Sequence, residues 1–112
     1  MSRRDAERLE DIIAAISAIR SHVARGTLSD GMVFDAVRVR LIEIGEAIKA
    51  LPAQLLETEA QTAWTDIARM RDRLAHRYFD TEHSFVAYAV DDELEPLEAA
   101  VSRLLARTLD VE

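Results

Sequence analysis

Residues 9–23 read Leu9-Glu10-Asp11-Ile12-Ile13-Ala14-Ala15-Ile16-Ser17-Ala18-Ile19-Arg20-Ser21-His22-Val23, and this stretch decides the fold class. Its leucine, isoleucines and valine recur mostly at steps of three or four residues, which places them on one face of a helix. The pattern predicts a first amphipathic helix over about residues 4–24.

The same spacing continues after a break near Gly26. It predicts a second helix over residues 32–51, capped by Ser29 or Asp30 and ended by Pro52. Two long amphipathic helices in succession favour a helical bundle.

A third apolar stripe includes Trp64, which we interpret as a core residue rather than a base-stacking platform because it lies on the apolar side. This helix is expected to open at Thr58 or Thr62 and to end within residues 76–79.

The rest of the chain is predicted to turn at Asp80 and Thr81, to form a short helix around residues 85–90, and to end in a longer helix with Pro96 in its first turn. No strand pattern competes with these helices. We therefore predict an all-α fold, an antiparallel four-helix bundle with one additional short helix.

Composition limits the class of protein. With 112 residues, 49% of them hydrophobic, the chain suits one domain, 1–112, and with no cysteine it has neither disulfides nor thiolate zinc sites. The start of the chain carries no apolar run of signal-peptide or membrane-span length, so we expect a cytoplasmic protein with no membrane contact. A net charge of -7 argues against nonspecific coating of nucleic acid, so any RNA contact must be local.

One basic island stands out: residues 69–77 hold four arginines and one histidine against a single carboxylate. Cleavage of RNA by internal transesterification needs a base for the 2′-hydroxyl, an acid for the leaving 5′-oxygen and cations around the phosphate. His76 suits the acid and base roles because histidine changes charge near neutral pH, and Arg71 suits bidentate phosphate binding. This chemistry demands no metal and no cofactor.

Helical geometry qualifies this assignment. Positions five apart lie about 140° apart around a helix, so Arg71 and His76 do not share a narrow stripe, whereas Asp72 and His76 do. Asp72 is thus expected to orient the imidazole or raise its basicity. A two-fold dimer that pairs this helix with its copy would bring two histidines and several arginines around one phosphodiester. Gly45 allows either close helix approach or ordinary packing, and Glu46 beside it can reach a nearby cation.

Three segments in order, Ile44-Gly45-Glu46-Ala47, Trp64-Thr65-Asp66-Ile67-Ala68 and Met70-Arg71-Asp72-Arg73-Leu74-Ala75-His76-Arg77-Tyr78, resemble the HepT-like branch of the HEPN ribonuclease family. That family combines an arginine, usually followed by a polar residue, with a histidine four to six positions on, and the HepT branch adds a tyrosine two residues later. Here Asp72 stands where asparagine is frequent, which adds negative charge.

The resemblance implies a metal-independent endoribonuclease toxin that acts as a homodimer, or a higher oligomer, with Arg71, His76 and Asp72 in its cleft. RNA would be the substrate, with Arg69, Arg73 and Arg77 as further phosphate contacts and Glu46 in support. The family also implies a partner, a nucleotidyltransferase antitoxin that transfers AMP to the tyrosine corresponding to Tyr78.

Two other functions remain open on the sequence. The same groove would hold a nucleotide or RNA without cutting it in a noncatalytic binding module. A helical interaction scaffold would use the same residues only to brace a dimer, because exposed charged residues on helices usually form solvated ion pairs.

Overall fold

The structure is a computed structural model that describes the backbone of residues 2–76 and 79–111 and the side chains of residues 2–76 and 83–107. All regular structure in these residues is helical, which confirms the predicted all-α class. The elements in chain order are α1 (Arg3–Arg25), α2 (Gly31–Ala50), α3 (Ala53–Leu56), the 3-10 turn η1 (Glu57–Glu59), α4 (Trp64–Ala75), α5 (Phe79–Tyr88), the π-helical η2 (Ala89–Glu93) and α6 (Leu94–Val111).

The first two helices begin at side-chain caps. Ser2 and Asp5 form a reciprocal capping box at the start of α1, in which the Ser2 hydroxyl accepts from the Asp5 amide. Asp30 caps α2 by accepting from the Met32 amide at 2.8 Å, so the second of the two predicted caps is the one used. Both helices keep their predicted extents to within a residue or two.

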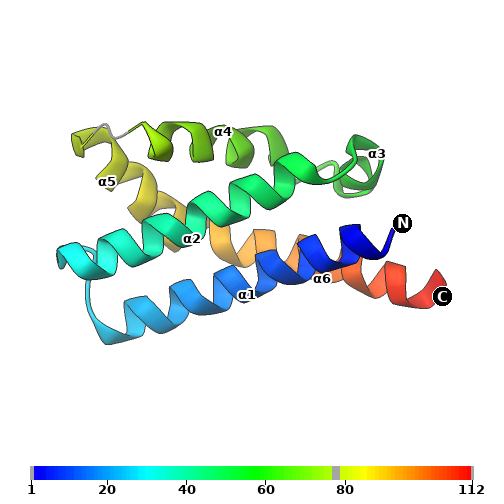
Figure 1. Cartoon of the computed structure of the whole chain (residues 1–112), viewed down its shortest axis with the longest axis horizontal. Helices are drawn as coiled ribbons and strands as arrows, with labels where there is room; N and C mark the ends of the chain where they lie inside the picture. The colour runs from blue at the N-terminus through cyan, green and yellow to red at the C-terminus, as the bar shows by residue number, and fades with distance from the viewer. Residues whose placement is uncertain (1, 77–78, 112) are drawn as a thin grey trace.

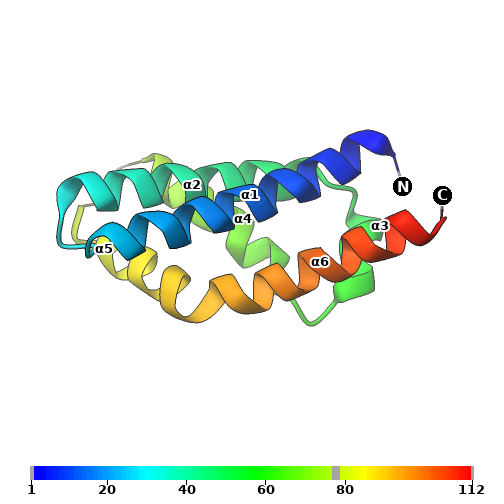
Figure 2. The same ribbon diagram turned by 90° about the horizontal axis from the view of Figure 1, so that it is seen from below.

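The long helices pack as an antiparallel bundle (Figures 1 and 2). Helix α1 lies between α2 and α6, while α4 packs on the other side of α2, and both chain ends lie at the same end of the bundle. The core is formed by aliphatic residues that are fully buried, among them Leu9, Ile12, Ile16, Ile19, Leu41, Ile44, Leu74, Val86, Val101 and Leu104. Within the described residues, no helix is long and apolar enough to cross a membrane.

Two details of the predicted boundaries are wrong. Helix α4 begins at Trp64 without a side-chain cap, and Thr58 instead donates from its hydroxyl to the Leu55 carbonyl at 2.7 Å within the α3–η1 turn. The Trp64 indole instead joins the first residue of α4 to the preceding turn, because its Nε1–H donates to the carbonyls of Leu56 and Glu59, each at 3.0 Å.

The second error concerns Asp80 and Thr81, which belong to α5 and not to a turn. Both fall in the first turn of that helix. Helix α5 then runs through η2 directly into α6, so the short helix and the final helix are continuous. Pro96 is the third residue of α6, as predicted.

Candidate active site

The candidate site begins at a close contact between α2 and α4. A Cβ atom built on Gly45 would overlap the Cβ of Arg71 and lie 3.1 Å from its Cγ and 3.4 Å from its Cα. Glycine at this position lets the two helix backbones approach each other. Of the two explanations for Gly45, the structure supports close helix approach.

This approach brings Arg71 beside two carboxylates. Its Nε forms an ion pair with Glu46, and its Nη1 donates to Asp72 Oδ1 at 3.1 Å. The hydrogen bond to Asp72, followed by attraction from Glu46, raises the pKa of the Arg71 guanidinium above its usual value. The guanidinium is thus held between Glu46 on its Nε and Asp72 on its Nη1.

Asp72 connects Arg71 to a second cation. Its Oδ1 accepts from Lys49 Nζ at 2.6 Å as well as from Arg71. The hydrogen bond from Lys49, and then that from Arg71, lowers the pKa of the Asp72 carboxyl. In the part of the chain that the structure describes, no hydrogen bond joins Asp72 to His76, so the carboxylate orients the cations rather than the imidazole.

His76 lies at the position where α4 ends. It is the C-cap residue, with φ -96° and ψ 0°, and its backbone amide donates to the Arg73 carbonyl at 3.2 Å. Its side chain is exposed to solvent. Arg71 therefore lies in the last two turns of α4 and His76 directly follows its last residue, with the guanidinium held by α2 and the imidazole exposed to solvent.

The other arginines of the basic island do not gather with Arg71. Residues two apart on a helix lie about 200° apart, so Arg69 and Arg73 project from the opposite side of α4. The Arg73 guanidinium lies 4.4 Å from the ring centroid of Phe85 of α5, a cation–π contact. Two further predicted residues, Arg77 and Tyr78, lie outside the described residues.

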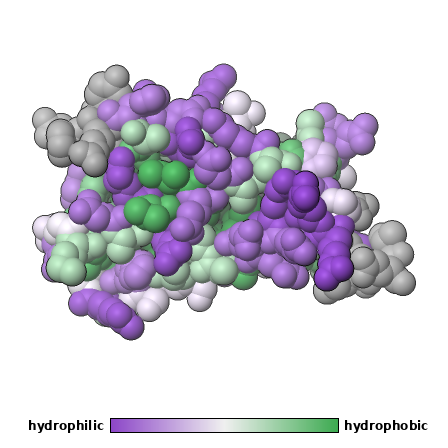
Figure 3. All heavy atoms as spheres, in the orientation of Figure 1, coloured by the Kyte–Doolittle hydropathy of each residue, from purple (hydrophilic) through white to green (hydrophobic). Residues whose placement is uncertain are grey.

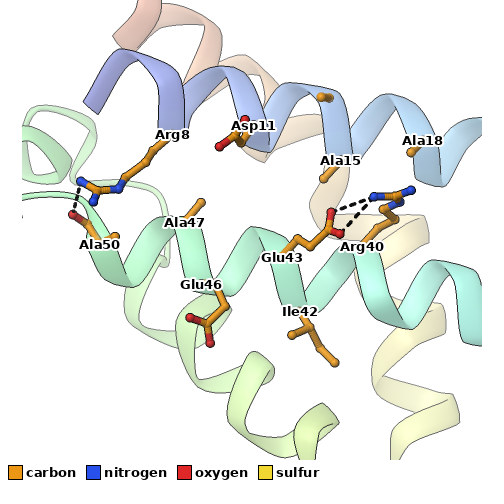
Figure 4. Close-up of a pocket in the computed structure, with 11 residues that line it drawn as sticks. Arg8, Asp11, Ala15, Ala18, Arg40, Ile42, Glu43, Glu46, Ala47 and Ala50 are labelled. Atoms are coloured by element: carbon orange, nitrogen blue, oxygen red, sulfur yellow. Dashed lines mark hydrogen bonds and ion pairs between the residues drawn. The ribbon is translucent and has the colours of Figure 1, made fainter. Parts of the chain in front are cut away.

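Glu46 also borders a groove on the side of α2 that faces α1, away from α4. A hollow of about 720 Å³ opens between α1 and α2, and alanines from both helices line its floor. Figure 4 shows that Arg40 and Glu43 pair on the α1 side of α2, whereas Glu46 and Ile42 leave α2 on the opposite side. The Glu46 carboxylate is therefore directed toward α4, where it meets Arg71.

Two cations near the site were not predicted. Lys49 is four residues beyond Gly45, and the Arg38 guanidinium donates from Nη2 to the Leu74 carbonyl in the last turn of α4. Both positions lie at helical spacing from Gly45, seven before it and four after it, which is the signal that the sequence offered. His83 bridges α5 to α2 by stacking on Phe34, with a centroid distance of 5.2 Å.

The arrangement suits the binding of a phosphate by a prearranged guanidinium and the movement of a proton by a nearby imidazole. The four charges of Glu46, Lys49, Arg71 and Asp72 balance one another, so this network alone carries no excess positive charge. Tight binding of an anion thus requires further cations from elsewhere. No group of three or more His, Cys, Asp or Glu residues that could hold a metal occurs among the described residues.

Comparison with known proteins gives a family match over residues 9–104, to the family described as Ribonuclease HepT-like. "Putative RNase TTE0752" of Caldanaerobacter subterraneus is 37% identical over 70 residues, which is 62% of this chain and 62% of that protein. "Probable ribonuclease HepT" of Thermococcus cleftensis is 29% identical over 108 residues, 93% of this chain and 98% of that protein. "Putative RNase MJ0127" of Methanocaldococcus jannaschii is 37% identical over 59 residues, 53% of this chain and 49% of that protein.

The match therefore spans less than two thirds of the first of these relatives and about half of the third. No solved structure gave a significant match. The resemblance to HepT-like ribonucleases that the three sequence segments indicated is confirmed by the family match.

Proposed function

The chain belongs to the HepT-like ribonuclease family, and on that premise we propose that it is a metal-independent endoribonuclease toxin that uses Arg71 and His76 at a homodimer cleft. The observation that carries the proposal is the fixed guanidinium of Arg71, which Gly45, Glu46 and Asp72 hold one and a half turns before the exposed imidazole of His76. A phosphate at the Arg71 guanidinium would lie on the side of α4 that faces α2.

In the proposed reaction a histidine takes the proton of a ribose 2′-hydroxyl, and the 2′-oxygen attacks the adjacent phosphorus. The bond from phosphorus to the 5′-oxygen breaks, and the departing 5′-oxygen receives a proton, so the products are a 2′,3′-cyclic phosphate and a 5′-hydroxyl. Arg71 remains charged throughout and stabilises the negative charge on the phosphate oxygens. No step needs a metal ion.

A second copy of the chain would add its own Arg71 and His76 to the cleft. Met32, Val39 and Glu46 lie seven residues apart, so they share one face of α2 with a drift of about 20° per step. Met32 is 84% exposed and Val39 48% exposed, although both are large and apolar. Figure 3 shows hydrophobic residues among hydrophilic ones on the face that is turned to the viewer in Figure 1. A two-fold contact over this stripe would bury the apolar side chains and bring two copies of the site together.

Arg69, Arg73 and Arg77 are retained as proposed phosphate contacts for the strand on either side of the cut. Arg69 and Arg73 face α5, so they would bind RNA that passes around the end of α4 rather than the phosphate at Arg71. Regulation is proposed to follow the family pattern, in which a nucleotidyltransferase antitoxin transfers AMP to Tyr78. The added bulk and negative charge two residues after His76 would oppose the entry of a phosphate.

The test is cleavage of end-labelled RNA by purified protein in EDTA. We expect products that end in a cyclic phosphate from the wild type and a loss of at least about a hundredfold in Arg71→Ala and His76→Ala. His22→Ala is the matched control, because His22 lies in the last turn of α1. RNA that is retained but not cut would instead support a binding module, and neither binding nor cleavage would support the scaffold.

The dimer is tested separately with Val39→Glu, which places a charge on the exposed stripe. We expect a monomer by light scattering, an unchanged helical circular dichroism spectrum and loss of cleavage. A monomer that retains full activity would contradict the shared cleft.

A further inference from the structure

The strongest unassigned feature is the contact between Arg38 and the end of α4. Arg38 projects from the middle of α2 and is half-buried between the helices. One of its contacts is the hydrogen bond from Nη2 to the Leu74 carbonyl, a residue 36 positions away in the chain. Leu74 itself is fully buried, so the bond attaches α2 to an anchored part of α4.

The Leu74 carbonyl needs a partner from outside its helix. Carbonyls in the last turn of an α-helix have no intrahelical amide to accept from, and α4 ends at Ala75. The last turn also carries the negative end of the helix dipole, which a guanidinium complements. Arg38 therefore satisfies both the hydrogen-bonding and the electrostatic requirement of this helix end.

His76 depends on the same turn for its position. It follows Leu74 by two residues, and its own backbone already departs from helical geometry. Its side chain is exposed and is not held by packing, so the backbone of the last turn of α4 sets the position of the His76 Cα and Cβ atoms, from which the imidazole extends. A shift of that turn moves His76 relative to Arg71, which is held independently at Gly45.

We propose that Arg38 is a positioning residue for the reaction: by binding the Leu74 carbonyl, it fixes the closing turn of α4 and hence the distance between the His76 imidazole and the Arg71 guanidinium. This rests on the proposed ribonuclease function. Helix α2 would then hold α4 at two places, at the contact between Gly45 and Arg71 and at the hydrogen bond from Arg38 to Leu74, two residues before His76. Arg38 acts through the backbone and does not touch the substrate.

Three variants separate the hydrogen bond from the charge. Arg38→Met keeps a long apolar stem without donor or charge, Arg38→Gln keeps a neutral donor, and Arg38→Lys keeps donor and charge. Arg40→Met is the matched control, because Arg40 is on the same helix but pairs with Glu43 at 3.0 Å on the side that faces α1.

We expect Arg38→Met to lower kcat about 10- to 100-fold with little change in KM, because a small displacement of a catalytic group slows chemistry rather than binding. Arg38→Gln and Arg38→Lys should each recover part of the loss, and Arg40→Met should match the wild type. A rise in KM with unchanged kcat would overturn the proposal, since it would make Arg38 a direct RNA ligand. Equal loss in all three variants, without recovery, would also overturn it.

A second measurement does not depend on cleavage. The chain has 3 histidines, so the imidazole Hε1 signals of His22, His76 and His83 are resolvable in a carbon–proton NMR spectrum. We expect the His76 signal to move in Arg38→Met and not in Arg40→Met, with His22 as the internal reference. An inactive wild type would refute the ribonuclease function, whereas an unmoved His76 signal would refute the role of Arg38.

Discussion

Replacement of Gly45 by alanine tests the contact on which the candidate site depends. The new Cβ would overlap the Cβ of Arg71 and approach its Cγ to 3.1 Å and its Cα to 3.4 Å. These atoms lie at or next to the backbone of α4, so no rotation of the arginine side chain removes the overlap. The two helices must move apart.

Two opposing contributions set the effect of Gly45→Ala on stability. Alanine favours a helix over glycine by about 1 kcal/mol, which alone would stabilise α2. Overpacking of a close helix contact costs about 1–3 kcal/mol, and here backbone atoms are affected. We therefore expect the free energy of unfolding to fall by about 1 kcal/mol, within a range of roughly 0 to 2 kcal/mol.

The effect of Gly45→Ala on cleavage should be much larger than its effect on stability. A displacement of Arg71 by about 1 Å is enough to reduce the rate about a hundredfold. Both quantities are measured on one protein preparation, by urea unfolding and by cleavage of labelled RNA. Gly31→Ala is the matched control, because nothing lies within 4 Å of the position its Cβ would occupy. A Gly45→Ala protein that is more stable than the wild type and equally active would refute the close-contact argument.

Three further outcomes follow from other contacts. Hydrogen bonds from Lys49 first, and then from Arg71, lower the pKa of the Asp72 carboxyl below its usual 3.8. The ionised carboxyl therefore stabilises the fold above pH 3.8, and this contribution is lost as the pH falls through the lowered pKa. Urea unfolding should thus show a smaller loss of stability between pH 7 and pH 3 for Asp72→Asn than for the wild type. Trp64→Phe removes the donor to two backbone carbonyls and should lower the free energy of unfolding by about 1–3 kcal/mol, as followed by circular dichroism. Glu59→Gln weakens the ion pair with Arg103, which lies at 2.7 Å, and should speed hydrogen exchange in the second half of α6 while leaving α1 unchanged.

Part of the fold could be predicted because it depends on local periodicity. The apolar steps in α1 and α2 match a helical period, and the cap at Asp30 and the stop at Pro52 are local features as well. The start of α4 could not be predicted in this way, since no capping side chain marks it and the Trp64 indole bonds to carbonyls of the preceding turn.

The candidate site shows the same division. The residue types of Arg71 and His76, and their place near the end of one helix, were evident from the sequence, as was a nearby cation partner for Glu46. The partner of Asp72 was not, because the carboxylate turns to Lys49 of α2 rather than along its own helix to His76. The spacing of residues within one helix predicts which side chains of that helix can meet, but it does not predict contacts with side chains of another helix.

The sequence by itself determined the helices, the family and the residues with suitable chemistry, because periodicity, caps and short motifs are carried by neighbouring residues. Only the tertiary structure decided that Gly45 lies beneath Arg71, that Arg38 binds the end of α4, and that Arg69 and Arg73 face away from the site. These contacts depend on the distance and rotation between packed helices, which arise when many buried side chains fill a common core together.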